Sequence, residues 1–175
     1  MLIRKATKED LLQVSRIYDD IHTQEEQGIV SIGWIRGVYP TFATAEHAME
    51  EDELFVEEAD GNIVGAAIIN QKQVPSYLEG TWNYNAPDQE IMVLHTLVIS
   101  PNAAGKSCGR KFVRFYEEYA LAHNCHYLRM DTNAINSRAR AMYQKLGYQE
   151  IGIVPTVFNG IEGVQLVLLE KYLGN

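Results

Sequence analysis

Residues 90–110, EIMVLHTLVISPNAAGKSCGR, carry the clearest chemical signal in the sequence. An apolar run predicts a buried strand, Pro101 ends it, and Gly105 and Gly109 lie where an apolar-periodic helix begins near Cys108. A helix N-terminus reached from a strand leaves several backbone N–H groups unpaired, and the helix dipole adds partial positive charge. Glycine lets the backbone approach a ligand closely. The stretch therefore predicts a site for a phosphate-like anion.

A nucleotide-binding P-loop is the first alternative, because Gly105-Lys106-Ser107 imitates the end of the motif G-x-x-x-x-G-K-[ST]. The first glycine of that motif would stand where the chain has Ser100, and Pro101 removes an N–H donor that the loop needs. The P-loop interpretation fails on both points.

A second chemical pattern lies downstream, in the segment NSRARAMYQKLGY over residues 136–148. Asn136 and Tyr143 are seven residues apart, which places them on one face of a helix, about 10 Å apart along its axis. That span suits one extended ligand touching both side chains. The alternative is that Asn136 only caps the helix and Tyr143 only fills the core.

Together the two segments resemble the GNAT N-acetyltransferases. Residues 97–101, LVISP, match the strand end L-x-V-x-P of that family, and residues 104–109 match its acyl-CoA loop, Q/R-x-x-G-x-G/A. The loop departs from the family at Ala104, where Gln or Arg is usual, and at Ser107, where Gly is usual. Residues 136–148 match the family segment N-x-x-A-x-x-x-Y-x-K-L-G-[FY].

The resemblance implies one α/β domain over residues 1–175, with a mixed, mostly antiparallel sheet of six to seven strands, a central parallel pair and about four helices. The residues agree, since strand-helix-strand steps over residues 91–131 require parallel pairing. Asp60-Gly61 joins two strands as a hairpin. Further strands are expected at 2–5, 148–154 and 163–172, and helices at 11–27, 44–51, 107–124 and 136–146.

The resemblance also implies an acetyl-CoA-dependent N-acetyltransferase that moves acetyl directly to a primary amine of a small molecule or peptide. Asn136 would bond the pantetheine arm, and Tyr143 would give its proton to the departing thiolate, uphill by only about 2 kcal/mol. A CoA-binding sensor without turnover is the alternative. The remaining cofactor contacts would come from backbone groups of Leu97, Val98 and Ile99 for pantetheine, and from Ala104, Gly105, Lys106, Ser107, Cys108, Gly109 and Arg110 for the pyrophosphate.

The acceptor amine needs a base, and His95, Glu90 and water are the candidates. In an unbroken strand His95 shares a face with Leu97 and Ile99, while Glu90 lies on the other. A neutral imidazole of pKa ~6.5 can accept a proton at pH 7, so His95 is the preferred base. A bulge in the strand would reverse these faces, and a histidine held by core hydrogen bonds is the structural alternative.

The resemblance implies that residues 29–41, a loop between helices, line the acceptor side, and Trp34 and Tyr84 are the candidate substrate residues. Trp34 has the alternative of covering the core edge. Residues 71–89 form an unusually long polar loop, which would either gate the acceptor pocket or make a homodimer contact.

Composition narrows the class of protein. The 175 residues are 46% hydrophobic and 22% charged, which excludes the disordered class. The net charge of −8 disfavours nucleic acid and favours a cationic acceptor such as an amine. The longest apolar run is far shorter than the ~18 residues of a membrane span, and no signal peptide is present, so a cytoplasmic protein is expected. Two cysteines and scattered histidines give neither a disulfide framework nor a metal-ligand spacing, so no metal is expected.

Overall fold

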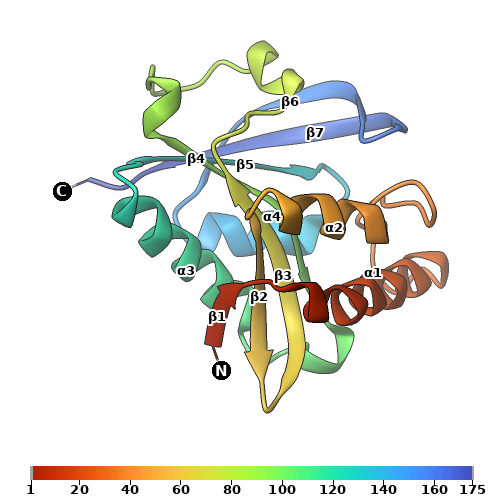
Figure 1. Cartoon of the computed structure of the whole chain (residues 1–175). Coiled ribbons are helices and arrows are strands. Elements are labelled where there is room, and N and C mark those ends of the chain that lie inside the picture. Colours follow the sequence, from red (N-terminus) through yellow and green to blue (C-terminus); the bar gives the residue numbers. More distant parts are fainter. Residues whose placement is uncertain (1, 175) are drawn as a thin grey trace.

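The sheet of this protein has seven strands in the order β1-β2-β3-β4-β5-β7-β6 (Figure 1). The computed structural model describes residues 2–174. All neighbouring strands are antiparallel except β4 and β5, which confirms the expected mixed sheet with a central parallel pair. The strands are β1 (Leu2–Lys5), β2 (Leu54–Ala59), β3 (Asn62–Asn70), β4 (Ile91–Ile99), β5 (Tyr127–Asn133), β6 (Gln149–Phe158) and β7 (Ile161–Tyr172).

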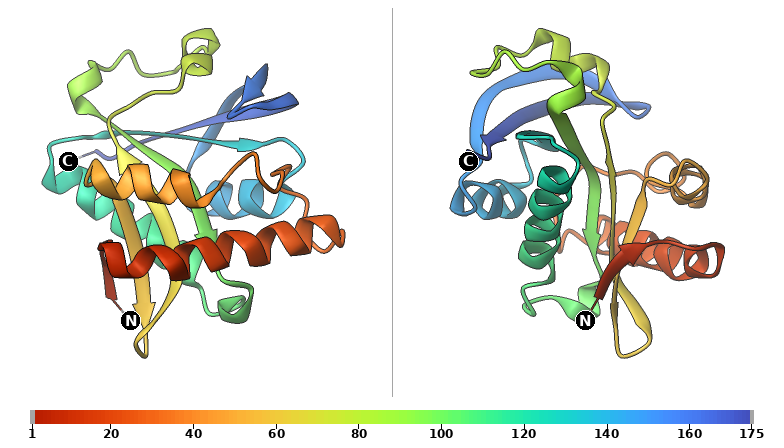
Figure 2. Two further views of the ribbon diagram at one scale, coloured as in Figure 1. Left: turned by 45° about the vertical axis from the view of Figure 1, so that its right-hand side comes forward. Right: turned by 60° about the vertical axis from the view of Figure 1, so that its left-hand side comes forward.

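Four α-helices cover the two faces, as predicted. The right view of Figure 2 places α3 (Cys108–Ala122) and α4 (Ser137–Lys145) on one side of the sheet, and α1 (Leu11–Glu26) and α2 (Phe42–Glu50) on the other. The side chains of α1 that recur at helical spacing are buried against α2, β2 and β3, namely Leu11, Val14, Ile17, Tyr18 and Ile21. None of the helices within residues 2–174 is both long enough and apolar enough to span a bilayer.

The C-terminal hairpin is longer than the sequence analysis predicted. Strands β6 and β7 turn at Asn159-Gly160, where both residues have positive φ, 49° and 81°. Asn-Gly is the preferred pair for such a two-residue turn, so this signal was available in the sequence.

The parallel pair at the centre of the sheet separates part-way along its length. Pairing between β4 and β5 runs only from Ile91↔Tyr127 to Leu94↔Met130. Beyond that point β4 stays paired with β3 as far as Ile99, and β5 stays paired with β7 as far as Asn133. The two strands therefore diverge, as Figure 1 shows, and their facing edges lose a strand partner.

A bulge in β4 reverses the predicted faces. The register with β3 shifts between Ala66↔Val98 and Ile68↔His95, and Thr96 has φ 51°. Positive φ is unfavourable for a β-branched residue, and the Thr96 hydroxyl is held by a hydrogen bond with the hydroxyl of Tyr39. Leu97 and Ile99 pack on the α3 side, whereas His95 points to the other face. The prediction that these three share a face was wrong.

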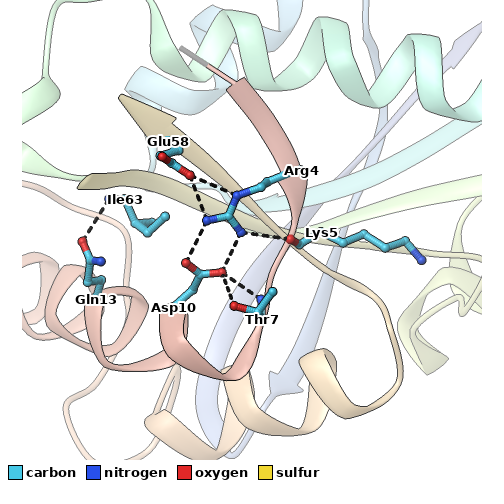
Figure 3. Close-up of polar contacts among 7 residues, drawn as sticks. All are labelled: Arg4, Lys5, Thr7, Asp10, Gln13, Glu58 and Ile63. Atoms are coloured by element: carbon cyan, nitrogen blue, oxygen red, sulfur yellow. Dashed lines mark hydrogen bonds and ion pairs between the residues drawn. The ribbon is translucent and has the colours of Figure 1, made fainter. Parts of the chain in front are cut away.

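A polar cluster ties the first strand to the first helix (Figure 3). Arg4 donates from Nη1 and Nη2 to both carboxylate oxygens of Asp10, at 2.7 and 3.0 Å, and from Nε to Glu58 at 3.0 Å. Asp10 also accepts from the backbone N–H of Thr7 at 2.8 Å, as part of a capping box. Asp10 is only 5% exposed, and its pKa is lowered, first of all by the Arg4 hydrogen bonds.

Candidate active site

A cleft with a volume of about 1540 Å³ occupies the gap between the diverging strands. One end lies between α3 and α4, and the other between α2 and the loop that connects α1 to α2. The cleft is lined by most residues that the sequence analysis assigned to the site, namely Trp34, His95, Leu97, Val98, Ile99, Ala104, Gly105, Ser107, Cys108, Gly109, Arg110, Asn136 and Tyr143. Lys106 is absent from this lining among the described residues.

The turn before α3 presents a set of free backbone donors. The N–H groups of Ala104 and Lys106 are occupied by the carbonyls of Pro101 and Ala103, at 3.1 and 3.3 Å. Within the described chain, Gly105 and residues 107–110 donate to no partner. Their position at the N-terminus of a 15-residue helix suits an anion. Of the seven backbone N–H groups predicted over residues 104–110, two are therefore unavailable to an anion and five remain.

Ser107 occupies a backbone conformation that favours glycine. It is the N-cap of α3 with φ 62° and ψ 17°, the left-handed region. A glycine adopts that region without the steric cost that a Cβ brings, which accounts for the glycine usual there in the family. The Ser107 hydroxyl accepts a hydrogen bond from Nη2 of Arg110 at 3.3 Å.

Helix α4 brings Asn136 and Tyr143 to the cleft. The Asn136 side-chain oxygen accepts from the N–H of Ala139 at 3.2 Å, so this oxygen caps the helix and the side-chain NH₂ is left to face the cleft. Tyr143 is 6% exposed, and burial raises the pKa of its hydroxyl, so it stays protonated at neutral pH. Among the described residues its hydroxyl has no hydrogen-bond partner.

His95 is part of a polar chain along the wall of the cleft. Its Nε2–H donates to Oδ1 of Asn70 at 2.8 Å, and Asn70 donates from Nδ2 to Glu53 at 2.8 Å. Glu53 forms an ion pair with Lys72 at 2.6 Å. Desolvation lowers the pKa of His95 to about 4. The imidazole is therefore neutral but only weakly basic, which favours the alternative of a histidine held by its neighbours.

Comparison with known proteins identifies the family of this chain. A profile described as the acetyltransferase (GNAT) family matches residues 14–148. The chain belongs to the GNAT acetyltransferase family. It is an acyltransferase, and the family uses acetyl-CoA.

Solved GNAT structures share the fold at low identity. A GNAT acetyltransferase of Streptococcus agalactiae is 22% identical with a TM-score of 0.82, covering 99% of this chain and 96% of that one. An acetyltransferase-like protein of Salmonella typhimurium, solved with its cofactor acetyl-CoA, is 17% identical with a TM-score of 0.71, covering 100% and 95%. A ribosomal-protein-alanine N-acetyltransferase of Brucella melitensis is 20% identical with a TM-score of 0.70, covering 99% and 100%.

The structure separates the two aromatic residues that were expected to line the acceptor side of this GNAT enzyme. Trp34 lines the cleft and meets Tyr39 edge-on, with ring centroids 6.1 Å apart. Tyr84 instead packs against Tyr127 and Tyr172, at 5.8 and 5.4 Å, and does not line the cleft. The prediction for Tyr84 is therefore corrected, because its ring packs against tyrosine rings of β5 and β7 outside the cleft.

Glu90 is likewise outside the GNAT cleft. It ends the 3-10 turn η3 (Asp88–Glu90), before β4 begins, and is not among the described residues that line the cleft. It therefore lacks the position that a base needs.

The cleft is lined by two carboxylates that the sequence analysis did not consider, Glu53, which forms an ion pair with Lys72, and Asp131. Asp131 of β5 lines the cleft, and its Oδ2 accepts a hydrogen bond from the hydroxyl of Tyr77 at 2.7 Å. Desolvation raises the pKa of Asp131 to about 6. An Asp inside a predicted strand, next to apolar Met130, was the available sequence signal. Among residues 2–174 no group of three or more His, Cys, Asp or Glu side chains is arranged to hold a metal ion.

Proposed function

We propose that this GNAT acyltransferase transfers acetyl from acetyl-CoA to a primary amine of a small molecule or peptide. The observation that carries the proposal is the single cleft that joins the free N–H groups before α3, the unpaired edge of β4 and the hydroxyl-bearing face of α4. An extended ligand with a pyrophosphate at one end and a thioester at the other matches this order of groups.

The pyrophosphate would be bound by the N–H groups of Gly105 and residues 107–110. The pantetheine arm would add to the free edge of β4 near Leu97 and Ile99, and it would meet the side-chain amide of Asn136. This arrangement satisfies backbone groups that the sheet leaves unpaired at the divergence.

Tyr143 would protonate the leaving sulfur. The amine nitrogen attacks the thioester carbon, the C–S bond breaks, and the sulfur takes the hydroxyl proton. Burial raises the pKa of Tyr143, which makes proton donation harder, but the same burial destabilises the thiolate and makes it a stronger acceptor. The two effects oppose each other, so transfer stays feasible.

Two measurements test the proposal. Acetyl-CoA or CoA at 100 times its Kd is expected to stabilise the protein by about 2.7 kcal/mol, whereas ATP leaves the melting temperature unchanged. A panel of primary amines with acetyl-CoA is then expected to release CoA thiol with at least one amine. Stabilisation by CoA without turnover on any amine would contradict transfer and indicate a CoA-binding sensor. No stabilisation at millimolar CoA would contradict the cofactor assignment as well.

A further inference from the structure

We infer that Asp131 accepts the proton of the attacking amine and that Tyr77 is the positioning residue that orients it; this inference rests on the proposed function. Asp131 immediately follows Met130, the last residue of β5 paired with β4. It therefore lies at the vertex where the strands diverge, with its side chain lining the cleft.

The carboxylate of Asp131 is oriented by a hydrogen bond from a residue that is distant in the sequence. Tyr77 belongs to the 3-10 turn η2 (Pro75–Glu79) and is 2% exposed, and its hydroxyl donates to Oδ2. Oδ1 receives no hydrogen bond from the described residues. One oxygen is thereby fixed, and the other is available to a ligand in the cleft.

The turn that carries Tyr77 is itself anchored to the sheet. Trp82 donates from Nε1 to the Tyr77 carbonyl at 2.8 Å, and the Arg129 guanidinium lies 4.0 Å from the Trp82 ring centroid. Arg129 also donates to Gln73 and to the carbonyl of Tyr84. The long loop is thus held at both ends around Tyr77, which gives the hydroxyl a defined position.

The groups around Asp131 leave its charge uncompensated. The hydrogen bond from Tyr77 of η2 lowers the pKa of Asp131. The charge of Asp131 in turn contributes to the raised pKa of Tyr143 on α4 and of Tyr39 in the α1–α2 connection. Arg129, two residues earlier on β5, is engaged by Trp82 and Gln73. Within residues 2–174 no Lys, Arg or His forms an ion pair with Asp131. A partly buried carboxylate without a cation is unfavourable, and a cationic ligand would supply the missing partner.

Asp131 is better suited to the amine than His95. With a pKa of about 6 it is ionised at pH 7.5, so it attracts an ammonium group, and it is a stronger base than an imidazole of pKa about 4. After burial, the negative charge of Asp131 is the second cause that raises the pKa of the Tyr143 hydroxyl, which places the proposed acid and base at the same part of the cleft.

The proton balance is complete with these two residues. One ammonium proton moves to Oδ1 of Asp131, the nitrogen lone pair attacks the thioester carbon, and the C–S bond breaks with its electron pair on sulfur. The sulfur takes the proton of Tyr143. The second proton of the nitrogen replaces it on the tyrosine oxygen, and Asp131 later releases its proton to solvent.

The test is the pH dependence of kcat with saturating acetyl-CoA and two amines of different pKa. Wild type is expected to lose activity below a midpoint near pH 6, equal for both amines. Asp131→Asn is expected to lower kcat by ~10²–10⁴-fold and to abolish this limb, while the Kd for CoA stays within about twofold and reports an intact fold. His95→Asn is expected to keep the wild-type midpoint.

Tyr77→Phe separates positioning from packing. The hydrogen bond from Tyr77 lowers the Asp131 pKa, so its removal is expected to move the midpoint upward and to lower kcat less at pH 9 than at pH 6. Tyr172→Phe and Glu79→Gln, matched controls outside the cleft, are expected to leave the profile unchanged. Equal rates for wild type and Asp131→Asn, or an unmoved midpoint in Tyr77→Phe, would overturn the inference alone. No turnover by wild type would overturn the proposed function and this inference together.

Discussion

The hydroxyl of Tyr77 and Oδ2 of Asp131 are 2.7 Å apart, although the two residues are 54 positions apart in the chain. This contact joins the long loop after β3 to the point where the central strands diverge. It offsets only part of the cost of desolvating the carboxylate, because the Asp131 pKa is still raised to about 6. The position therefore costs folding stability whenever Asp131 is ionised.

Asp131→Asn is expected to stabilise the fold at high pH. A raised carboxyl pKa means that the folded state binds the proton more tightly than the unfolded state. The cost is absent below the ordinary pKa of 3.8, grows as pH rises to about 6 and is complete above it. Two pKa units correspond to about 3 kcal/mol at most, since each unit is worth ~1.4 kcal/mol.

Urea unfolding at pH 8 and at pH 4.5 measures this change. The gain in unfolding free energy is expected to be large at pH 8 and small at pH 4.5. Asp19→Asn, an exposed substitution, is the matched control and should change little at either pH. The same gain at both pH values would contradict the assigned pKa.

Ser107→Gly is expected to preserve or raise stability, by up to about 1 kcal/mol. Glycine removes the steric cost of positive φ, offset in part by its larger freedom in the unfolded chain. Ser107→Ala keeps the strained backbone, loses the hydroxyl that Arg110 contacts, and should weaken CoA binding by about 1 kcal/mol. Thermal unfolding and a CoA titration of both variants decide the point. Equal loss of CoA affinity in both would show that the hydroxyl matters and the backbone strain does not.

Asp10→Asn is expected to destabilise the fold by roughly 1–2 kcal/mol, because the part-exposed Arg4 guanidinium loses a charged partner but keeps its hydrogen bonds to Glu58. The Asp10 pKa is lowered in the folded state, so its contribution is present above the ordinary pKa of 3.8 and is lost as pH falls through the folded value. Unfolding free energy measured from pH 7 down to pH 2.5 should show the gap between wild type and variant closing below pH 4. A constant gap would contradict an ionic role.

Local patterns predicted most of the fold, since strand alternation, helical periodicity and the Asp60-Gly61 turn are decided by neighbouring residues. The bulge at Thr96 was beyond such reasoning. At the bulge the Thr96 hydroxyl shares a hydrogen bond with the hydroxyl of Tyr39, 57 positions away in the chain, and His95 lies on the opposite face from Leu97.

The turn before α3 was predicted from the sequence as an anion site, which stays a prediction, and two of its seven predicted donors are occupied because Ala104 and Lys106 use their N–H groups in local turns. The departure at Ser107 was visible in the sequence, but its left-handed backbone conformation is known only from the structure. Asp131 was missed since a carboxylate gains its character from what surrounds it, here a tyrosine of a remote loop. Tyr84 was misassigned for the same reason, because its ring packs against Tyr127 and Tyr172, which are distant from it in the sequence.

The most direct test of acetyl transfer in this cleft is the single-turnover rate of amine acetylation by Tyr143→Phe, measured beside its Kd for CoA. Only the transition state develops thiolate charge, so the rate is expected to fall by ~10²-fold or more while the Kd stays nearly constant. Wild-type turnover on an amine together with an unchanged rate in the variant would contradict the account and leave Tyr143 a packing residue.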